Sequence, residues 1–203
     1  MPVTRMAVFI SGRGSNFMAI HREAEKGAIR GEIALVVSDD PQAPGLAYAR
    51  EKGIEAAVFA KGKGEARADY FERVSSFLDE KKIDLIVLAG FMKVLSPNIV
   101  KKYRHRILNI HPALLPSFPG THAQKQAIDY GVKWTGCTVH FVDEGVDTGP
   151  IILQQAVPVL EGDTEESLSE RILEQEHRIF PEAVRLFCEG RLEVQGRRVR
   201  IKP

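Results

Sequence analysis

Short apolar segments alternate with helical patterns along the first 110 residues, and this alternation limits the chain to one class of fold. The strand-like segments are Met6–Ile10, Glu32–Ser38, Ala56–Phe59, Asp84–Ala89 and Ile107–Ile110. The helix-like segments are Asn16–Lys26, Gly45–Lys52, Ala66–Glu80 and Pro97–Tyr103. Strands that are apolar along their whole length are typical of a sheet buried on both faces. The pattern predicts an α/β fold: an open, mainly parallel twisted sheet with helices on both faces.

The pattern changes after residue 111. An irregular, proline-containing loop precedes a predicted helix at Ala123–Tyr130, and two predicted strands follow at Thr135–Val142 and Pro150–Val157. Leu192–Ile201 alternates around a Gln-Gly pair and predicts a terminal hairpin, whose arginines are expected to face solvent. We expect these strands to be antiparallel additions to the sheet, within a single domain of residues 1–203 that divides into 1–110, 111–190 and 191–203.

Three positions carry helix signals. Ser96 is expected to cap a helix that begins at Pro97, because serine caps well and proline suits the first helical position. A long helix is expected to begin near Asp163, with Glu166 completing a capping box, and to run toward Cys188. Pro181 is expected to kink or split it.

Composition excludes several classes of protein. A net charge of +1 produces no strong field for nucleic acid or an anionic membrane, and no apolar run approaches the ~18 residues of a membrane span. Cys137 and Cys188 indicate buried thiols in a reducing cytoplasm, so we expect a cytoplasmic protein. The six histidines lack metal-ligand spacing, and His140 and His177 are expected to be structural or to support the site residues from behind. Composition leaves the oligomeric state open.

A glycine-containing loop, Ser11 to Asn16, follows the first predicted strand and opens a helix. Glycines permit a tight turn, and the N–H groups at a helix start then converge on an anion. The loop lacks the third glycine of a dinucleotide fingerprint, because Phe17 stands there. It therefore indicates a site for one phosphate, with a plain strand-to-helix turn as the alternative.

Asn109 and His111 lie two residues apart at the end of a predicted strand, so their side chains project to the same side. An amide donor beside an imidazole suits a developing oxyanion. Asp147, between two glycines of a later acidic turn, is the candidate carboxylate partner, and Asp143 and Glu144 are its rivals. We expect that carboxylate to raise the pKa of His111 and favour imidazolium. The alternative is a purely structural histidine.

Six motifs carry a resemblance to a known family. They are Ile-Ser-Gly-Arg-Gly-Ser-Asn at 10–16, Leu-Ala-Gly-Phe-Met-Lys-Val-Leu-Ser-Pro at 88–97, Asn-Ile-His-Pro-Ala-Leu-Leu-Pro at 109–116, Val-His-Phe-Val at 139–142, Asp147 before Thr-Gly-Pro, and Gln-Glu-His at 175–177. With these, the chain resembles the phosphoribosylglycinamide formyltransferases, folate-dependent enzymes of purine synthesis, from about residue 6 to residue 192.

The resemblance implies a Rossmann-like formyltransferase fold and an attack by the glycinamide ribonucleotide amine on the formyl carbon of 10-formyltetrahydrofolate, without a metal. By position, His111 resembles the general acid and oxyanion stabiliser, Asn109 its partner donor and Asp147 the carboxylate that tunes the imidazole. The other implied contacts are Gly14, Ser15 and Asn16 for the substrate phosphate, Glu176 for the substrate, and Arg67, Met92, Lys93, Val94, Leu95 and Asn109 for folate. Residues 1–110 would then form the phosphate-binding half and 111–190 the folate and catalytic half.

The chain departs from the family pattern at two positions. Lys93 stands where arginine is common, and Arg13 stands where a smaller polar residue is frequent. Lys93 would still pair with a folate glutamate tail, but as a point charge without the planar fork of arginine. We therefore expect the lysine to affect the affinity for the folate glutamate tail and not the reaction itself.

Other formyl-folate enzymes are the nearest alternatives. A tRNA formyltransferase would carry a further RNA-binding domain, and only ~50 residues follow the Asp147 turn here. A formyltetrahydrofolate hydrolase would carry an additional N-terminal domain, and a sugar formyltransferase is a further alternative. A non-catalytic phosphate-binding module would keep the glycine loop without needing Asn109, His111 and Asp147 together.

Overall fold

A computed structural model describes residues 3–203 and contains one nine-stranded sheet. The strands are β1 (Thr4–Ile10), β2 (Gly31–Ser38), β3 (Ala56–Val58), β4 (Leu85–Leu88), β5 (Ile107–His111), β6 (Trp134–Phe141), β7 (Ile151–Pro158), β8 (Leu192–Gln195) and β9 (Arg198–Ile201). The helices are α1 (Ser15–Glu25), α2 (Pro44–Glu51), α3 (Arg67–Glu80), α4 (Pro97–Lys102), α5 (Ala123–Tyr130) and α6 (Glu165–Cys188). The predicted α/β class is confirmed.

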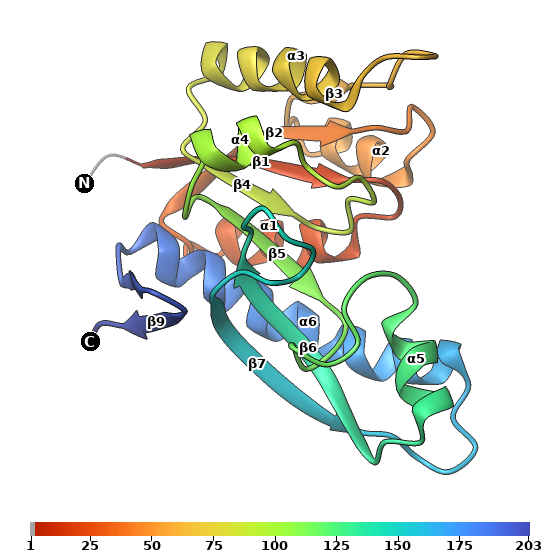
Figure 1. Cartoon of the computed structure of the whole chain (residues 1–203). Helices are drawn as coiled ribbons and strands as arrows, with labels where there is room; N and C mark the ends of the chain where they lie inside the picture. The colour runs from red at the N-terminus through yellow and green to blue at the C-terminus, as the bar shows by residue number, and fades with distance from the viewer. Residues whose placement is uncertain (1–2) are drawn as a thin grey trace.

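The strand order is β3-β2-β1-β4-β5-β6-β7-β9-β8. The first five strands are parallel, whereas β6 pairs antiparallel with both β5 and β7 (Figure 1). The predicted hairpin forms from the antiparallel pair β8 and β9, and β9 joins the sheet through a short parallel pairing with β7, so the hairpin extends the sheet. The predicted antiparallel additions are therefore confirmed, and the carboxyl ends of β1, β2, β4 and β5 share one edge.

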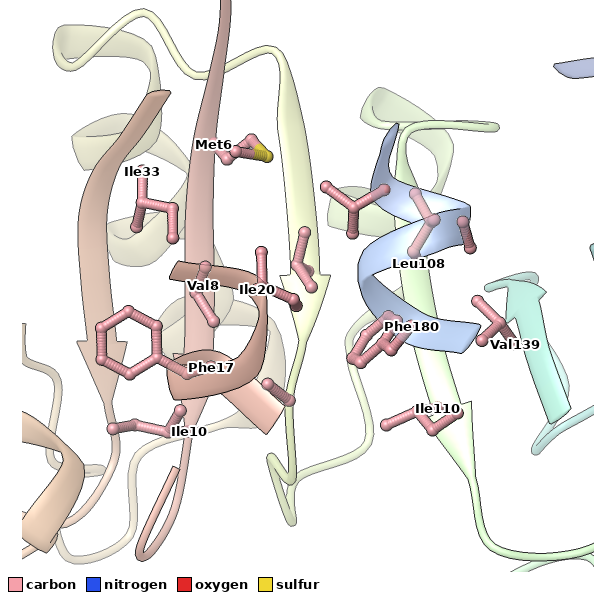
Figure 2. Packing of buried hydrophobic residues seen from close by; sticks show 14 of the residues in the cluster. Met6, Val8, Ile10, Phe17, Ile20, Ile33, Leu108, Ile110, Val139 and Phe180 are labelled. Atoms are coloured by element: carbon pink, nitrogen blue, oxygen red, sulfur yellow. The ribbon is translucent and has the colours of Figure 1, made fainter. Parts of the chain in front are cut away.

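Alternation along each strand divides the core into two layers. Met6, Val8 and Ile10 face the layer of α1, α2 and α6, whereas Ala7 and Phe9 face the layer of α3 and α4. Figure 2 shows the first layer, in which Phe17 of α1 packs beside β1. Strands β1, β4 and β5 and the second half of β2 bury both faces, which explains why these segments are continuous apolar runs, whereas the edge strand β3 is only partly buried.

Helix α6 corrects two details of the sequence prediction. Thr164 is the N-cap, and its capping box is completed by Ser167, not by Glu166. Because the box joins the N-cap to the third helical residue, an N-cap at Thr164, one residue later than Asp163, moves the partner from Glu166 to Ser167. Pro181 does not split the helix, which runs unbroken through it. Phe180 and Pro181 lie on the buried face, and we attribute continuity to that packing.

Helix α4 begins at Pro97 as predicted, and Ser96 is its N-cap residue. The Ser96 hydroxyl makes no capping hydrogen bond, however, and is buried without a partner among the described residues. The prediction of a side-chain cap was wrong, since position alone does not orient a hydroxyl. Within residues 3–203, no helix is long and apolar enough to cross a membrane.

Candidate active site

His111 is the last residue of β5 and is only 4% exposed. Its Nε2 lies 2.8 Å from the carbonyl oxygen of Phe118, in the loop that follows the strand. Its Nδ1 lies 3.3 Å from Oδ2 of Asp147, which belongs to the turn between β6 and β7. The loop after β5 and the turn between β6 and β7 thus present one acceptor to each ring nitrogen, and a neutral ring with its proton on Nδ1 directs that N–H toward Asp147.

Asn109 contacts a second histidine, His140, for which the sequence analysis left a structural and a supporting role open. Asn109 and His140 are opposite residues of the antiparallel β5–β6 pair, and the Asn109 Nδ2 donates to His140 Nε2 at 3.1 Å. His140 Nδ1 donates to the Phe141 carbonyl at 2.9 Å, and its Nε2 lies 3.6 Å from Oδ1 of Asp147. His140 therefore lies between Asn109 and Asp147, with its Nε2 near both side chains. This contact follows from the pairing of β5 with β6, which the sequence pattern does not predict.

The turn that carries Asp147 is held by its own polar groups. Asp147 has a left-handed φ of 54°, and its Oδ2 accepts from the Gly120 N–H at 2.8 Å. Asp143 uses its Oδ1 to accept from the Thr148 hydroxyl at 2.6 Å and from the Gly145 N–H at 3.1 Å. Asp143 therefore braces the turn, and Asp147 is the carboxylate of this turn that reaches the two imidazoles.

Burial decides the protonation of His111. Desolvation lowers the pKa of its imidazole, outweighing the Asp147 carboxylate and the Phe118 carbonyl, which raise it. The expectation of a raised pKa was therefore wrong, because His111 is more deeply buried than a strand-end position suggested. Burial opposes ionisation of Asp147 as well, but His140 and the Gly120 N–H outweigh it and keep the pKa of Asp147 below its usual value.

These side chains line one cavity of about 470 Å³, within the usual size range of small-molecule sites. The predicted residues on its wall are Met92, Lys93, Val94, Leu95, Asn109, His111 and Asp147. Met92 is 73% exposed, and Val94 and Val146 are also exposed. Large apolar side chains left open at a cavity suit an apolar ring system. Arg67, at the start of α3, is exposed and is not part of this wall.

The glycine loop lies beside the same cavity. The Ser11 N–H donates to the Gly90 carbonyl at 3.0 Å, which links the end of β1 to the cavity wall. Gly14 adopts a φ of 71°, which favours glycine, and α1 begins at Ser15 without a side-chain cap. The free N–H groups of the first turn are therefore available to an anion.

Asn16 and Glu176 meet across 160 residues of sequence. The Asn16 Nδ2 donates to Oε2 of Glu176 at 2.7 Å, and both side chains are buried. Burial raises the pKa of Glu176. The Asn16 Oδ1 is buried without a partner among the described residues. The structure thus turns the Asn16 side-chain amide toward α6, while the Asn16 backbone N–H belongs to the uncapped first turn of α1.

Comparison with known proteins agrees with this geometry. The formyl transferase domain family matches residues 4–184. A solved glycinamide ribonucleotide transformylase 1 from Symbiobacterium toebii is 50% identical, with a TM-score of 0.95 over 99% of this chain and 95% of that one. The phosphoribosylglycinamide formyltransferase of Escherichia coli K12 is 41% identical over 93% of this chain and 89% of its own.

A longer relative also matches. The trifunctional purine biosynthetic protein adenosine-3 of Drosophila melanogaster is 47% identical over 92% of this chain, and the match spans 14% of that protein. Fold, site geometry and these matches agree, and the chain belongs to the formyl transferase family.

Proposed function

We propose that this protein transfers the formyl group of 10-formyltetrahydrofolate to the amine of glycinamide ribonucleotide. The products are formylglycinamide ribonucleotide and tetrahydrofolate, an exchange that belongs to purine biosynthesis. The observation that carries the proposal is the meeting of Asn109, His111 and Asp147 at one cavity beside the N-terminus of α1. The names of the relatives that match most of this chain support the choice of substrates.

The reaction requires no nucleophilic side chain. The amine nitrogen attacks the formyl carbon, and the carbonyl oxygen takes on negative charge. The bond from that carbon to the folate nitrogen then breaks, as the folate nitrogen gains a proton and the attacking nitrogen loses one. Positioned donors and a proton relay are what such a tetrahedral oxyanion needs.

Asn109 and His111 are the donors in this proposal. The Asn109 amide has two N–H bonds, and His140 takes one of them, which leaves the second for the oxyanion. The Nε2 of His111 faces the Phe118 carbonyl, which a substrate oxygen would replace. Asp147 stabilises the proton on the other ring nitrogen. The low pKa of His111 allows the ring to return to neutrality in each cycle.

The two substrates bind at neighbouring parts of the site, the ribonucleotide phosphate at the start of α1 and the folate in the cavity. Gly14, Ser15 and the backbone of Asn16 would hold the ribonucleotide phosphate at the start of α1, and Glu176 would contact the same substrate. Met92, Val94 and Leu95 would cover the folate ring, with Lys93 nearer the tail. The substrates are small molecules, and a cytoplasmic location is part of the same proposal.

A formyl-transfer assay tests the activity. Wild-type protein should produce formylglycinamide ribonucleotide, and His111→Ala should lose at least about 100-fold in kcat while still binding both substrates. His177→Ala is the matched control, because His177 lies on α6 and does not line the cavity. Formate release without ribonucleotide would instead indicate a hydrolase, and ligand binding without turnover would indicate a non-catalytic module.

Inorganic phosphate tests the ribonucleotide site separately. Phosphate should compete with glycinamide ribonucleotide and not with formyl-folate, because the proposed anion site lies at α1 and not in the cavity wall. Ser15→Ala should raise the KM for the ribonucleotide. Equal inhibition against both substrates would contradict the assignment of residues 14–16.

A further inference from the structure

The loop that forms one wall of the cavity is tied to the ends of two strands. The Met92 N–H donates to the Ser11 hydroxyl oxygen at 2.9 Å, and that hydroxyl donates to Oδ1 of Asp39 at 2.6 Å. Ser11 follows β1, and Asp39 follows β2, so both lie at the edge where the parallel strands end. One carboxylate thereby helps to set the backbone position of Met92.

The second oxygen of the same carboxylate has a different partner. The Lys93 ammonium lies 3.0 Å from Oδ2 of Asp39. The Asp39 side chain is 11% exposed and that of Lys93 is 32% exposed, so water screens the pair only in part. Lys93 lines the cavity, and its charge is matched within the protein before any ligand arrives.

We propose that Asp39 is a specificity-determining residue that competes with an anionic ligand tail for Lys93. The proposal rests on the proposed function, because the tail in question is the glutamate tail of formyl-folate. With Asp39 ionised, the formal charge of the pair is zero, and the Asp39 carboxylate repels a ligand carboxylate that approaches Lys93. The protein therefore attracts the tail less than an unpaired lysine at this position would.

Asp39→Asn is the informative change. Asparagine keeps an oxygen that accepts from the Ser11 hydroxyl, so the link to Met92 remains, but the formal charge beside the cavity rises from zero to +1. The KM for formyl-folate with a glutamate tail should fall about two- to fivefold, the range expected for a partly exposed ion pair. The KM for 10-formyltetrahydropteroate, which has no glutamate, should not change.

Asp40→Asn is the matched control. Asp40 is the next residue, is exposed, and uses its Oδ1 to accept from the Gln42 N–H instead of contacting Lys93. The substitution Asp40→Asn changes the net charge of the protein by the same amount as Asp39→Asn, at the neighbouring position. A Lys93→Met background gives the second control. There Asp39→Asn removes only the direct repulsion between carboxylates and frees no ammonium, so its effect on tail preference should be smaller.

The measurement is the ratio of KM values for tail-bearing and tail-free formyl donors, at low and high salt, in wild type and each variant. A rise in tail preference for Asp39→Asn alone, reduced by salt, supports the proposal. An equal change for both donors, a change matched by Asp40→Asn, or a weaker preference for the tail overturns it. If wild type binds both donors but transfers no formyl group, the proposed function fails, and dissociation constants measured by calorimetry decide the role of Asp39.

Discussion

Replacing Asp147 with asparagine removes one charge from the centre of the proposed site with little change in shape. Asparagine tolerates the left-handed backbone at this position, where φ is 54°. Its side-chain oxygen still accepts from the Gly120 N–H. We therefore expect the fold and the binding of both substrates to persist, and the chemical step to slow.

The distance between Asp147 and His111 sets the size of the effect. At 3.3 Å and an effective dielectric constant of about 20, a carboxylate and an imidazolium attract by about 5 kcal/mol. The dipole of the asparagine amide retains part of this attraction, so we expect the variant to lose about 3 kcal/mol of transition-state stabilisation. Since each 1.4 kcal/mol changes a rate about tenfold, kcat should fall about 100- to 1,000-fold.

The pH dependence has a defined sign. The Asp147 carboxylate raises the pKa of His111 against the larger effect of burial. Without that carboxylate the pKa falls further, so the limb of the pH–rate profile that reports His111 should move to lower pH.

Steady-state kinetics between about pH 5 and pH 9, with thermal unfolding as a check on the fold, make the test. Asp143→Asn is the control, because Asp143 braces the same turn and contacts neither imidazole. It should lose less than tenfold. A loss below threefold for Asp147→Asn, or profiles that coincide with wild type, would refute the reasoning.

Three further changes test other parts of the structure. Glu176→Gln should raise Tm at pH 8 and not at pH 4. Burial raises the pKa of the Glu176 carboxyl, so the folded state favours the protonated form. The contribution of this carboxyl to folding stability is therefore present at acidic pH and is lost as pH rises through the folded-state pKa, whereas glutamine stays neutral at both pH values. The same variant should raise the KM for the ribonucleotide. Gly14→Ala should destabilise the protein by about 1–2 kcal/mol in denaturant titrations, because φ is 71° there, and should weaken phosphate inhibition. Thr138→Val should cost about 1–3 kcal/mol of unfolding free energy, because the buried Leu115 N–H loses its acceptor, and unchanged stability would contradict that accounting.

Local patterns were sufficient for the elements and for part of the site. The parallel half could be predicted because strands buried on both faces are apolar throughout, as β4 is. Asn109 and His111 could be paired because side chains two apart on a strand share a side. The glycine at position 14 indicated that a helix with free N–H groups begins at the next residue. Each of these inferences needs only a few neighbouring residues.

The sequence alone therefore determined the strand–helix rhythm and the local geometry of the Ser11–Asn16 loop and the Asn109–His111 pair. Only the tertiary structure decided which distant groups complete them. His140 reaches Asn109 through antiparallel pairing, Asp39 reaches Lys93 across neighbouring strand ends, and burial lowers the His111 pKa that a carboxylate alone would raise. The physical reason is that contact partners and desolvation depend on how the whole chain packs, whereas turn and strand preferences act over a few residues.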